Sequence, residues 1–171
     1  MTDLSAEEIR GVWRGQVQPV SAELLPPGLP PATREFLTTI GFPTVPVLDY
    51  TFFRDDRLSA LIRRGGHEYL VFAENTSNSV FGVELESEAV YRMHRAYPED
   101  QRDFYNSNIA LFVYFHGLLD KNVLSLDEVN EQLLVDAVNS VRVPLAERDP
   151  GALSDDAPWR WTLSDLETEW Q

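Results

Sequence analysis

The sequence predicts an α+β protein in which an antiparallel, hairpin-built sheet packs against N-terminal and C-terminal helices. Three observations predict this class. Helix-capping patterns lie near both ends of the chain, short β-branched and aromatic segments fill its middle, and turn residues separate those segments at close spacing. The length of 171 residues is typical of a single domain, which we expect to span residues 1–171.

The first two helices are predicted from their ends. Ser5 and Glu8 have the spacing of a capping box, and apolar residues follow at helical intervals. A proline-rich connector then leads to a second helix, which we expect to start at Pro30 and Pro31, to run to Ile40 and to stop at Gly41.

The middle of the chain is predicted to form four or five antiparallel strands. The candidate strands are residues 45–53, 58–62, 69–73, 80–85 and 89–93. Gly65 and Gly66 favour a hairpin between the second and third of them, because glycine readily adopts positive φ. Residues 69–73 are apolar without interruption, which indicates a strand buried on both faces. A second hairpin is expected around Glu86-Ser87-Glu88.

Helices are expected again after the strands. Asn106 or Ser107 should cap the apolar segment 109–119, which we expect to lie on the sheet. Residues 125–128 repeat the capping-box pattern before a further helix, whose buried face would include Val129, Leu133, Ala137, Val138 and Val141. Residues 159–163 alternate in polarity, so we predict a strand there that closes a sheet edge or covers the core.

Composition restricts the kinds of partner. The chain has 28 acidic against 14 basic side chains and a formal charge of −14, and the segment 147–171 belongs to its most acidic third. This charge argues against direct binding of nucleic acid, because phosphates are bound by Lys and Arg. It suits a basic partner, or serves solubility alone. We expect a cytoplasmic protein without membrane contact, since neither a basic-then-apolar leader nor an apolar run of about 20 residues is present.

The sequence contains none of the catalytic or metal-binding patterns that we sought. Cysteine is absent, which excludes thiolate zinc sites, thiol nucleophiles and disulfides. His67, His94 and His116 are too far apart in sequence to share one helical face as zinc ligands. Glycine-rich phosphate loops and nucleophile elbows are missing as well. We therefore expect no cofactor, no metal and no enzyme activity, although a carboxylate-pair hydrolase stays open because two carboxylates can meet across a fold.

Acidic side chains in predicted turns are the candidate contacts with a partner. Glu84, Glu86 and Glu88 alternate, which places them on one face of a strand or its turn. Such residues either form a solvated face or steer a basic protein, with neighbouring aromatic residues as anchors. The candidate partner-binding residues are Asp55, Asp56, Glu84, Glu86, Glu88, Tyr97, Glu99, Asp100, Asp103 and Tyr105.

Several segments resemble a known family. Residues 29–43, LPPATREFLTTIGFP, are similar to the "LP…R.FL..vGLP" segment of the SUKH superfamily of bacterial immunity proteins, in its fourth branch. The segments YLVFA (69–73), VFGVEL (80–85) and NSNIALF (106–112) resemble later blocks of that branch. The resemblance covers roughly residues 25–120, and Asn108 stands where the family often has serine.

The resemblance implies an α+β fold and a non-catalytic role. Proteins of this family bind and neutralise a cognate toxin of a polymorphic toxin system, often a nuclease or a deaminase, and the acidic surface would suit a basic toxin cleft. Two alternatives stay open. The first is a regulatory or scaffold protein of the same fold with a non-toxin partner, and the second is the carboxylate-pair hydrolase.

Overall fold

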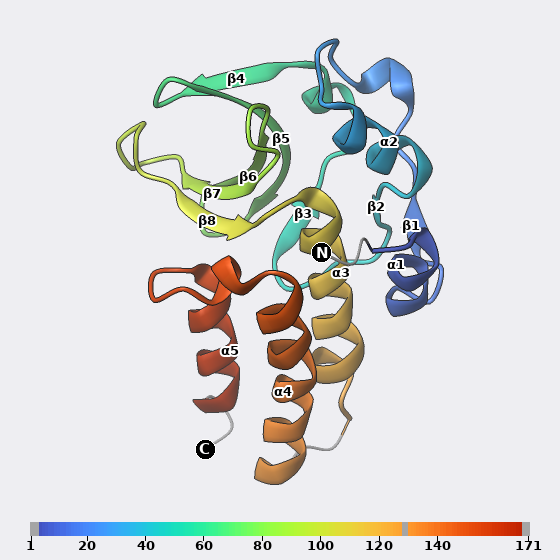
Figure 1. Ribbon diagram of the computed structural model, residues 1–171, viewed down its shortest axis with the longest axis vertical. Helices are drawn as coiled ribbons and strands as arrows, with labels where there is room; N and C mark the ends of the chain where they lie inside the picture. Colours follow the sequence, from blue (N-terminus) through green and yellow to red (C-terminus); the bar gives the residue numbers. More distant parts are fainter. Residues whose placement is uncertain (1–3, 128–129, 169–171) are drawn as a thin grey trace.

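The computed structural model describes residues 4–127 and 130–168, and in it a curved antiparallel sheet stands above a layer of helices (Figure 1). Hydrogen bonds order the strands β3-β5-β6-β7-β8, and β4 pairs with the first half of β5. The strands are β3 (Tyr50–Phe52), β4 (Leu61–Arg64), β5 (His67–Asn75), β6 (Ser79–Glu84), β7 (Val90–His94) and β8 (Asp103–Asn106). The α+β prediction is confirmed.

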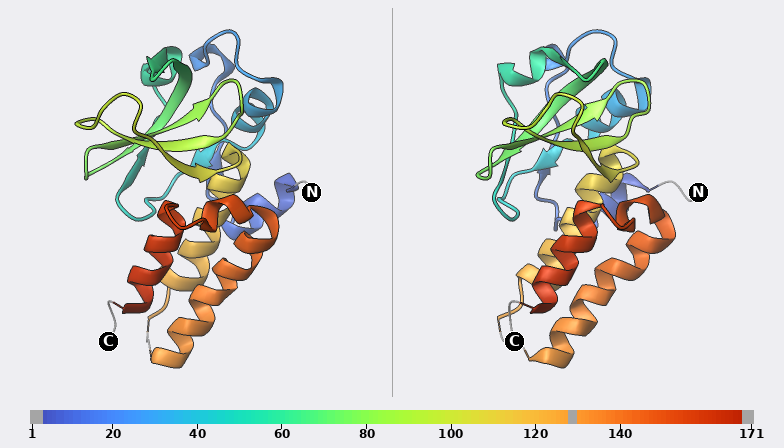
Figure 2. Two further views of the ribbon diagram at one scale, coloured as in Figure 1. Left: turned by 60° about the vertical axis from the view of Figure 1, so that its left-hand side comes forward. Right: turned by 90° about the vertical axis from the view of Figure 1, so that its left-hand side faces the viewer.

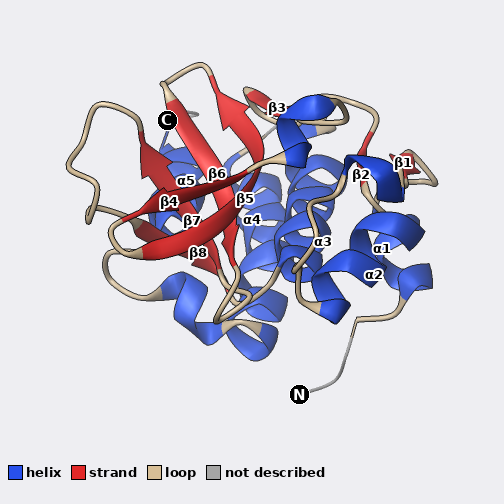
Figure 3. Cartoon of the chain, turned by 90° about the horizontal axis from the view of Figure 1, so that it is seen from above, coloured by secondary structure: helices blue, strands red, loops and turns tan. Residues whose placement is uncertain are grey.

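The helices lie on two sides of the sheet. Seen from above, the strands lie over α4 and α5, whereas α1 and α2 lie beside the sheet (Figure 3). The helices are α1 (Ala6–Val12), α2 (Pro31–Thr39), α3 (Ile109–Leu119), α4 (Glu131–Arg148) and α5 (Pro158–Thr168). Short strands β1 (Val17–Gln18) and β2 (Phe42–Pro43) pair beside α1, and short helical turns occupy residues 22–24, 56–59, 120–124 and 150–153.

Several predicted elements occur where their patterns indicated. Ser5 accepts a hydrogen bond from the backbone of Glu8, whose carboxylate bonds back to Ser5, so the capping box is present. Both predicted hairpins form, as β4–β5 and β6–β7. Residues 69–73 of β5 are buried throughout, as the uninterrupted apolar run predicted.

Two predicted strands are too long. Within residues 45–53 only β3 is a regular strand, and Leu58 lies in a 3₁₀ turn that precedes β4. Asp55 causes this turn, because its side chain accepts a hydrogen bond from the backbone of Arg57 and caps the turn. Phe53 and Leu58 are buried although they lie outside the strands.

The prediction of a strand at residues 159–163 is wrong. These residues belong to α5, which packs beside α4 and α3 below the sheet (Figure 2). Trp159 and Leu163 are buried four residues apart on one helical face, and Trp161 is 44% exposed. The segment forms a helix because Trp159 and Leu163 are then buried on the same face. The alternation of polar and apolar residues between them does not correspond to two faces of a strand.

The starts of α3 and α4 also differ from the prediction. Asn108 caps α3 by accepting a hydrogen bond from the backbone of Leu111, whereas Asn106 and Ser107 were expected in that role. Helix α4 begins at Glu131 and is capped by Asn130. The predicted capping box at 125–128 includes Glu128, and the predicted buried face of the next helix includes Val129. Both of these residues lie outside the described residues.

The buried face of α4 is close to the predicted one. Ala137, Val138 and Val141 are buried as expected. Leu133 is 40% exposed and its neighbour Leu134 is buried instead, so the face is rotated slightly from the prediction.

The core fills the space between the sheet and α3. The rings of Phe72 in β5 and Phe112 in α3 pack edge to face with centroids 5.2 Å apart. On the other side of α3, Gly117 lets α1 approach closely, because a Cβ there would lie 2.7 Å from the indole nitrogen of Trp13. That indole donates to the carbonyl of Val113 at 2.9 Å. In the part of the chain that the structure describes, no helix has the length and apolar character needed to cross a membrane.

Candidate functional site

The structure separates the predicted contact residues by exposure. Six of them have exposed side chains: Asp55, Asp56, Glu86, Tyr97, Glu99 and Asp100. Glu88 and Asp103 are half-buried, and Glu84 and Tyr105 are 4% and 1% exposed. A partner could not touch Glu84 or Tyr105 without a rearrangement of the protein, so neither belongs to the exposed surface.

Glu84 lies inside an ionic cluster on the sheet. Arg102 forms an ion pair with Glu84 and donates to the hydroxyl of Tyr69, and Nδ1 of His67 lies 2.6 Å from the Glu84 carboxylate. Burial raises the pKa of Glu84, but the hydrogen bonds from Ser87 and Arg102 outweigh burial and the pKa is lowered. The expectation that Glu84, Glu86 and Glu88 share one exposed face is therefore wrong, because Glu84 turns inward to these partners.

Tyr105 belongs to the core. Its hydroxyl shares a 2.9 Å hydrogen bond with that of Tyr50, and burial raises the pKa of Tyr105 well above its usual value. Asp103, two residues before it, accepts two hydrogen bonds from Arg92, at 2.8 and 3.0 Å. Asp103 is thus committed to a neighbouring strand rather than free for a partner.

Ion pairs join two of the exposed regions. Glu74 in β5 binds Arg57 at 3.3 Å and Arg95 at 2.7 Å. Arg57 also binds Asp55, and this hydrogen bond lowers the pKa of Asp55. The Asp55-Asp56 turn and the connection that follows β7 are therefore linked through one carboxylate, although more than 30 residues separate them in sequence.

The connection between β7 and β8 carries an exposed aromatic residue. We call residues 94–100 the 94–100 turn; in Figure 1 it lies at the left, beside the β4–β5 hairpin. Tyr97 is 52% exposed and its ring stacks on that of His94 with centroids 4.3 Å apart. Glu99 and Asp100 follow on the surface. We call the exposed set Asp55, Asp56, Tyr97, Glu99 and Asp100 the edge surface.

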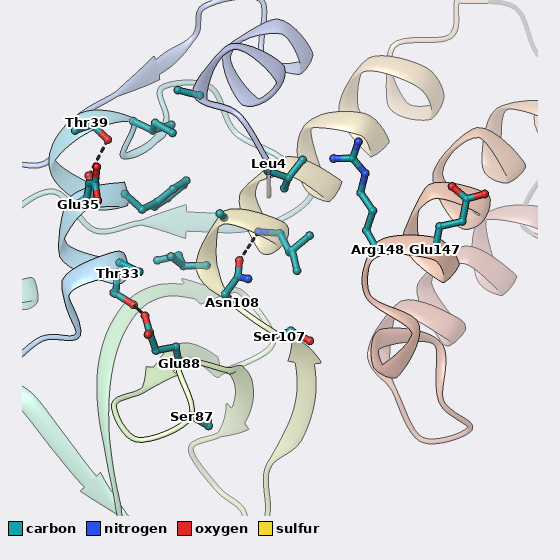
Figure 4. A pocket seen from close by; sticks show the side chains of 17 residues that line it. Leu4, Thr33, Glu35, Thr39, Ser87, Glu88, Ser107, Asn108, Glu147 and Arg148 are labelled. Atoms are coloured by element: carbon teal, nitrogen blue, oxygen red, sulfur yellow. Dashed lines mark hydrogen bonds between the residues drawn. The ribbon is translucent and has the colours of Figure 1, made fainter. Parts of the chain in front are cut away.

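A hollow of about 1010 Å³ lies on another part of the molecule. Helix α2, the β6–β7 turn, the start of α3 and the end of α4 enclose it (Figure 4). Thr33 of α2 donates to the Glu88 carboxylate at 2.8 Å and so ties the turn to the helix. On the opposite wall, Arg148 binds Glu8 of α1 at 2.9 Å. Glu35 and Glu147 add carboxylates to the lining.

Among the described residues, the groups with the largest pKa shifts lie apart from the hollow and the edge surface. Among residues 4–127 and 130–168, no three His, Asp or Glu side chains gather closely enough to hold a metal ion. The pKa values that the structure shifts most belong to Tyr50, Tyr105 and His116. Tyr105 and His116 are buried in the core and Tyr50 packs against it, and none of the three lines the hollow. What the surface offers is carboxylates and a half-exposed tyrosine ring.

Comparison with known proteins identifies the family. The family model described as "SUKH-4 immunity protein" matches residues 10–165. The chain belongs to the SUKH-4 immunity protein family. The match extends beyond the residues 25–120 that the resemblance covered, and it includes α4 and most of α5. Searches of curated proteins and of solved structures returned no match.

The Asn106-Ser107-Asn108 motif of this SUKH-4 protein has a structural role. Asn106 accepts from the indole of Trp159 at 3.0 Å and donates to Asp149 at 2.8 Å. The backbone and hydroxyl of Ser107 also donate to Asp149, which is 1% exposed. We call this set the Asp149 network. It joins β8, the start of α3 and the C-terminal helices, so the motif stabilises the fold.

Some residues that shape the SUKH-4 surface carried no signal in the sequence. Arg64, Glu74 and Arg95 hold the edge surface together, but their partners are distant in sequence. Arg64 was visible only as part of a hairpin turn. Without a known pairing of strands, nothing in its neighbourhood indicates that its side chain reaches residues 94–99.

Proposed function

We propose that this protein binds a cognate toxin and neutralises it by stoichiometric occupation. The toxin would carry a basic surface, as nuclease and deaminase domains that act on nucleic acid do. Membership of the SUKH-4 immunity family supports the toxin-binding role. The formal charge of −14 supports a basic partner, since opposite potentials steer two proteins together.

The edge surface is the observation that carries the proposal at the level of residues. Asp56, Glu99 and Asp100 are exposed and form no ion pair with another described residue, so their charge is available to a partner. Tyr97 beside them supplies an aromatic ring of the type that dominates binding energy at interfaces. Glu86 and Glu88 lie at the other end of the β6–β7 hairpin and would at most form a second contact region.

Inhibition by occupation requires no chemistry from this chain. The carboxylates of the hollow are divided between its walls, and two of the charged groups there already have partners, Glu88 in Thr33 of α2 and Arg148 in Glu8 of α1. We therefore infer a non-catalytic inhibitor whose partner is a protein.

A titration with a purified candidate toxin domain, chosen from the neighbouring reading frames, tests the proposal. Adding the purified protein should abolish the toxin's activity with an end point at one molecule per toxin. The informative variant reverses Asp56, Glu99 and Asp100 to Lys, and we expect at least a hundredfold weaker inhibition, because several charge pairs at about 1 kcal/mol or more each are lost and replaced by repulsion.

The matched control carries the same change in net charge on the helical layer. Reversal of the exposed residues Glu131, Asp156 and Asp165 to Lys should weaken inhibition far less than the edge reversal. Equal effects of the two triple variants would show that total charge matters and the edge surface does not. Failure of the unaltered protein to inhibit would refute the proposed function itself.

A further inference from the structure

We propose that the 94–100 turn is the element that enters the toxin, and that Arg64 is the positioning residue that holds this turn ready before binding. The inference rests on the proposed function, since a toxin is taken as the partner. It adds a specific anchor, a residue that preorganises the anchor, and a requirement on the partner's surface.

Arg64 binds the backbone of the turn at four points. Its Nη2 donates to the carbonyls of His94 at 2.8 Å, Tyr97 at 2.9 Å and Pro98 at 3.0 Å, and its Nε donates to the carbonyl of Glu99 at 3.3 Å. One guanidinium thus binds four of the seven backbone carbonyls of the turn. The planar fork of arginine suits this role, which the single ammonium of lysine could not reproduce.

The residue after Arg64 lets the hairpin approach the turn. Gly65 has a φ of 56°, and a Cβ at this position would lie 2.9 Å from the carbonyl oxygen of Glu99. Any other residue would push the β4–β5 hairpin away from the turn. The hairpin and the turn therefore close over one face of the curved sheet, and Arg64 is at the point of closure.

The turn also has internal bonds that fix Tyr97. The backbone N–H of Tyr97 donates to the carbonyl of His94 at 3.2 Å, and that of Ala96 donates to Nδ1 of His94 at 3.2 Å. The imidazole so held stacks against one face of the Tyr97 ring and leaves the rest exposed. A tyrosine whose backbone and ring are already ordered loses little conformational freedom on binding.

The turn specifies the chemistry of its partner. A protruding ring needs a concave, largely apolar pocket, and Glu99 and Asp100 next to it need Lys or Arg on the rim of that pocket. A basic cleft of a toxin domain meets both requirements. We therefore expect Tyr97 to occupy the toxin's cleft with its two carboxylates paired at the rim.

Adjacent arginines allow a sharp test. Arg63 is exposed and makes no side-chain hydrogen bond or ion pair with the described residues, so Arg63→Ala and Arg64→Ala remove the same charge from neighbouring positions. Loss of a positive charge alone should leave binding to a basic toxin equal or slightly tighter. We expect Arg64→Ala to weaken binding about tenfold because the turn must then be ordered on binding, with Arg63→Ala unchanged or tighter. Tyr97→Ala should weaken binding about thirtyfold.

A measurement without the toxin separates the positioning role from a general loss of stability. Hydrogen exchange of the amides of Ala96, Tyr97 and Gln101, which are bonded within the turn, should be at least about tenfold faster in Arg64→Ala and unchanged in Arg63→Ala. Amides of β5 and β6 should exchange equally in all three proteins. Arg64→Lys should resemble Arg64→Ala in exchange, because the fork geometry is lost.

The outcomes distinguish this inference from the proposed function. If Tyr97→Ala and Arg64→Ala both bind the toxin as the unaltered protein does, the 94–100 turn is not the contact element, although the proposed function stands. If exchange within the turn is the same in Arg64→Ala and Arg63→Ala, Arg64 is not its positioning residue. If the unaltered protein does not bind the toxin, the proposed function fails first.

Discussion

His116 is a fully buried imidazole among aromatic rings. Its Nδ1 donates to the carbonyl of Phe112 at 2.7 Å, and its Nε2 has no partner among the described residues. The rings of Phe112, Tyr50, Tyr105 and Trp159 surround it. Burial lowers the pKa of His116 to about 4, because the charged form would be desolvated.

The protein should therefore lose stability as the pH falls from neutral. In the unfolded chain the pKa of this histidine is about 6.5, so below that pH only the unfolded state takes up the proton. The contribution of His116 to the free energy of unfolding should fall by about 2 kcal/mol between pH 7 and pH 5 and level off near pH 4. Urea unfolding at pH 7, 6 and 5 measures the free energy of unfolding of the unaltered protein and of His116→Leu. The stability of the unaltered protein relative to the variant should fall as the pH falls. A difference independent of pH would contradict the prediction.

Single residues also show where sequence patterns mislead. The alternation of Glu84, Glu86 and Glu88 indicated one shared face, but a hairpin reverses direction between them. Glu84 ends β6 facing Arg102, and Glu88 follows the turn with a φ of 61° and faces Thr33. Side chains two residues apart share a face only within a strand. The alternation therefore could not predict where Glu86 and Glu88 point, because both lie in the connection after β6.

At the scale of elements, α5 shows how two periodicities compete. Trp159, Trp161 and Leu163 alternate with polar residues, yet Trp159, Leu163 and Leu166 also have helical spacing, and Pro158 suits a first helical position. The hairpins were predictable because glycine and polar turn residues separate short apolar runs. The C-terminal helix was not, because five residues are too few to decide between the two periods.

The indole hydrogen bond of Trp159 gives this element a measurable role. Trp159→Phe would remove the donor to Asn106, leaving an amide oxygen unpaired in the interior together with a small cavity. We expect the free energy of unfolding to fall by about 2–4 kcal/mol. Trp161→Phe on the same helix, where the ring is 44% exposed, should change it by about 0.5 kcal/mol or less. Chemical denaturation of both variants checks the contrast, and equal losses would count against the Asp149 network as a stabilising feature.

At the scale of the whole molecule, charge should control the speed of association. Long-range attraction acts over about 30 Å at 10 mM ionic strength and about 8 Å at 150 mM. We expect the association rate with a basic toxin to fall at least about tenfold between these conditions, with the dissociation rate changing about twofold or less. Stopped-flow mixing measures both rates. Neutralising Asp56, Glu99 and Asp100 as amides should flatten the salt dependence, and a dependence as steep as before would place the steering charge elsewhere.

The candidate site was only partly predictable at this scale. Net charge and the family resemblance indicated the kind of partner, and the exposed residues Asp55, Asp56, Tyr97, Glu99 and Asp100 were among those named from sequence. Which carboxylates remain available could not be foreseen, because it depends on arginines such as Arg92 and Arg102 that the strand order brings to Asp103 and Glu84. Tyr105 was wrongly predicted to be a contact residue. Its ring is covered in part by Trp159 of α5, a tertiary contact that the sequence pattern did not indicate.

The Asp149 network has a consequence for how the chain comes apart. The Asp149 carboxylate accepts hydrogen bonds from Asn106 of β8 and from Ser107 before α3. It directly precedes the last two helical segments, residues 150–153 and α5. Peeling Asp149 away together with those segments would leave its carboxylate, two amide N–H groups and the Ser107 hydroxyl without partners. Partial fraying from the C-terminal side is thereby penalised, and disassembly is driven toward a single cooperative event. Proteolytic cleavage within residues 149–168 should then require the domain to open as a whole.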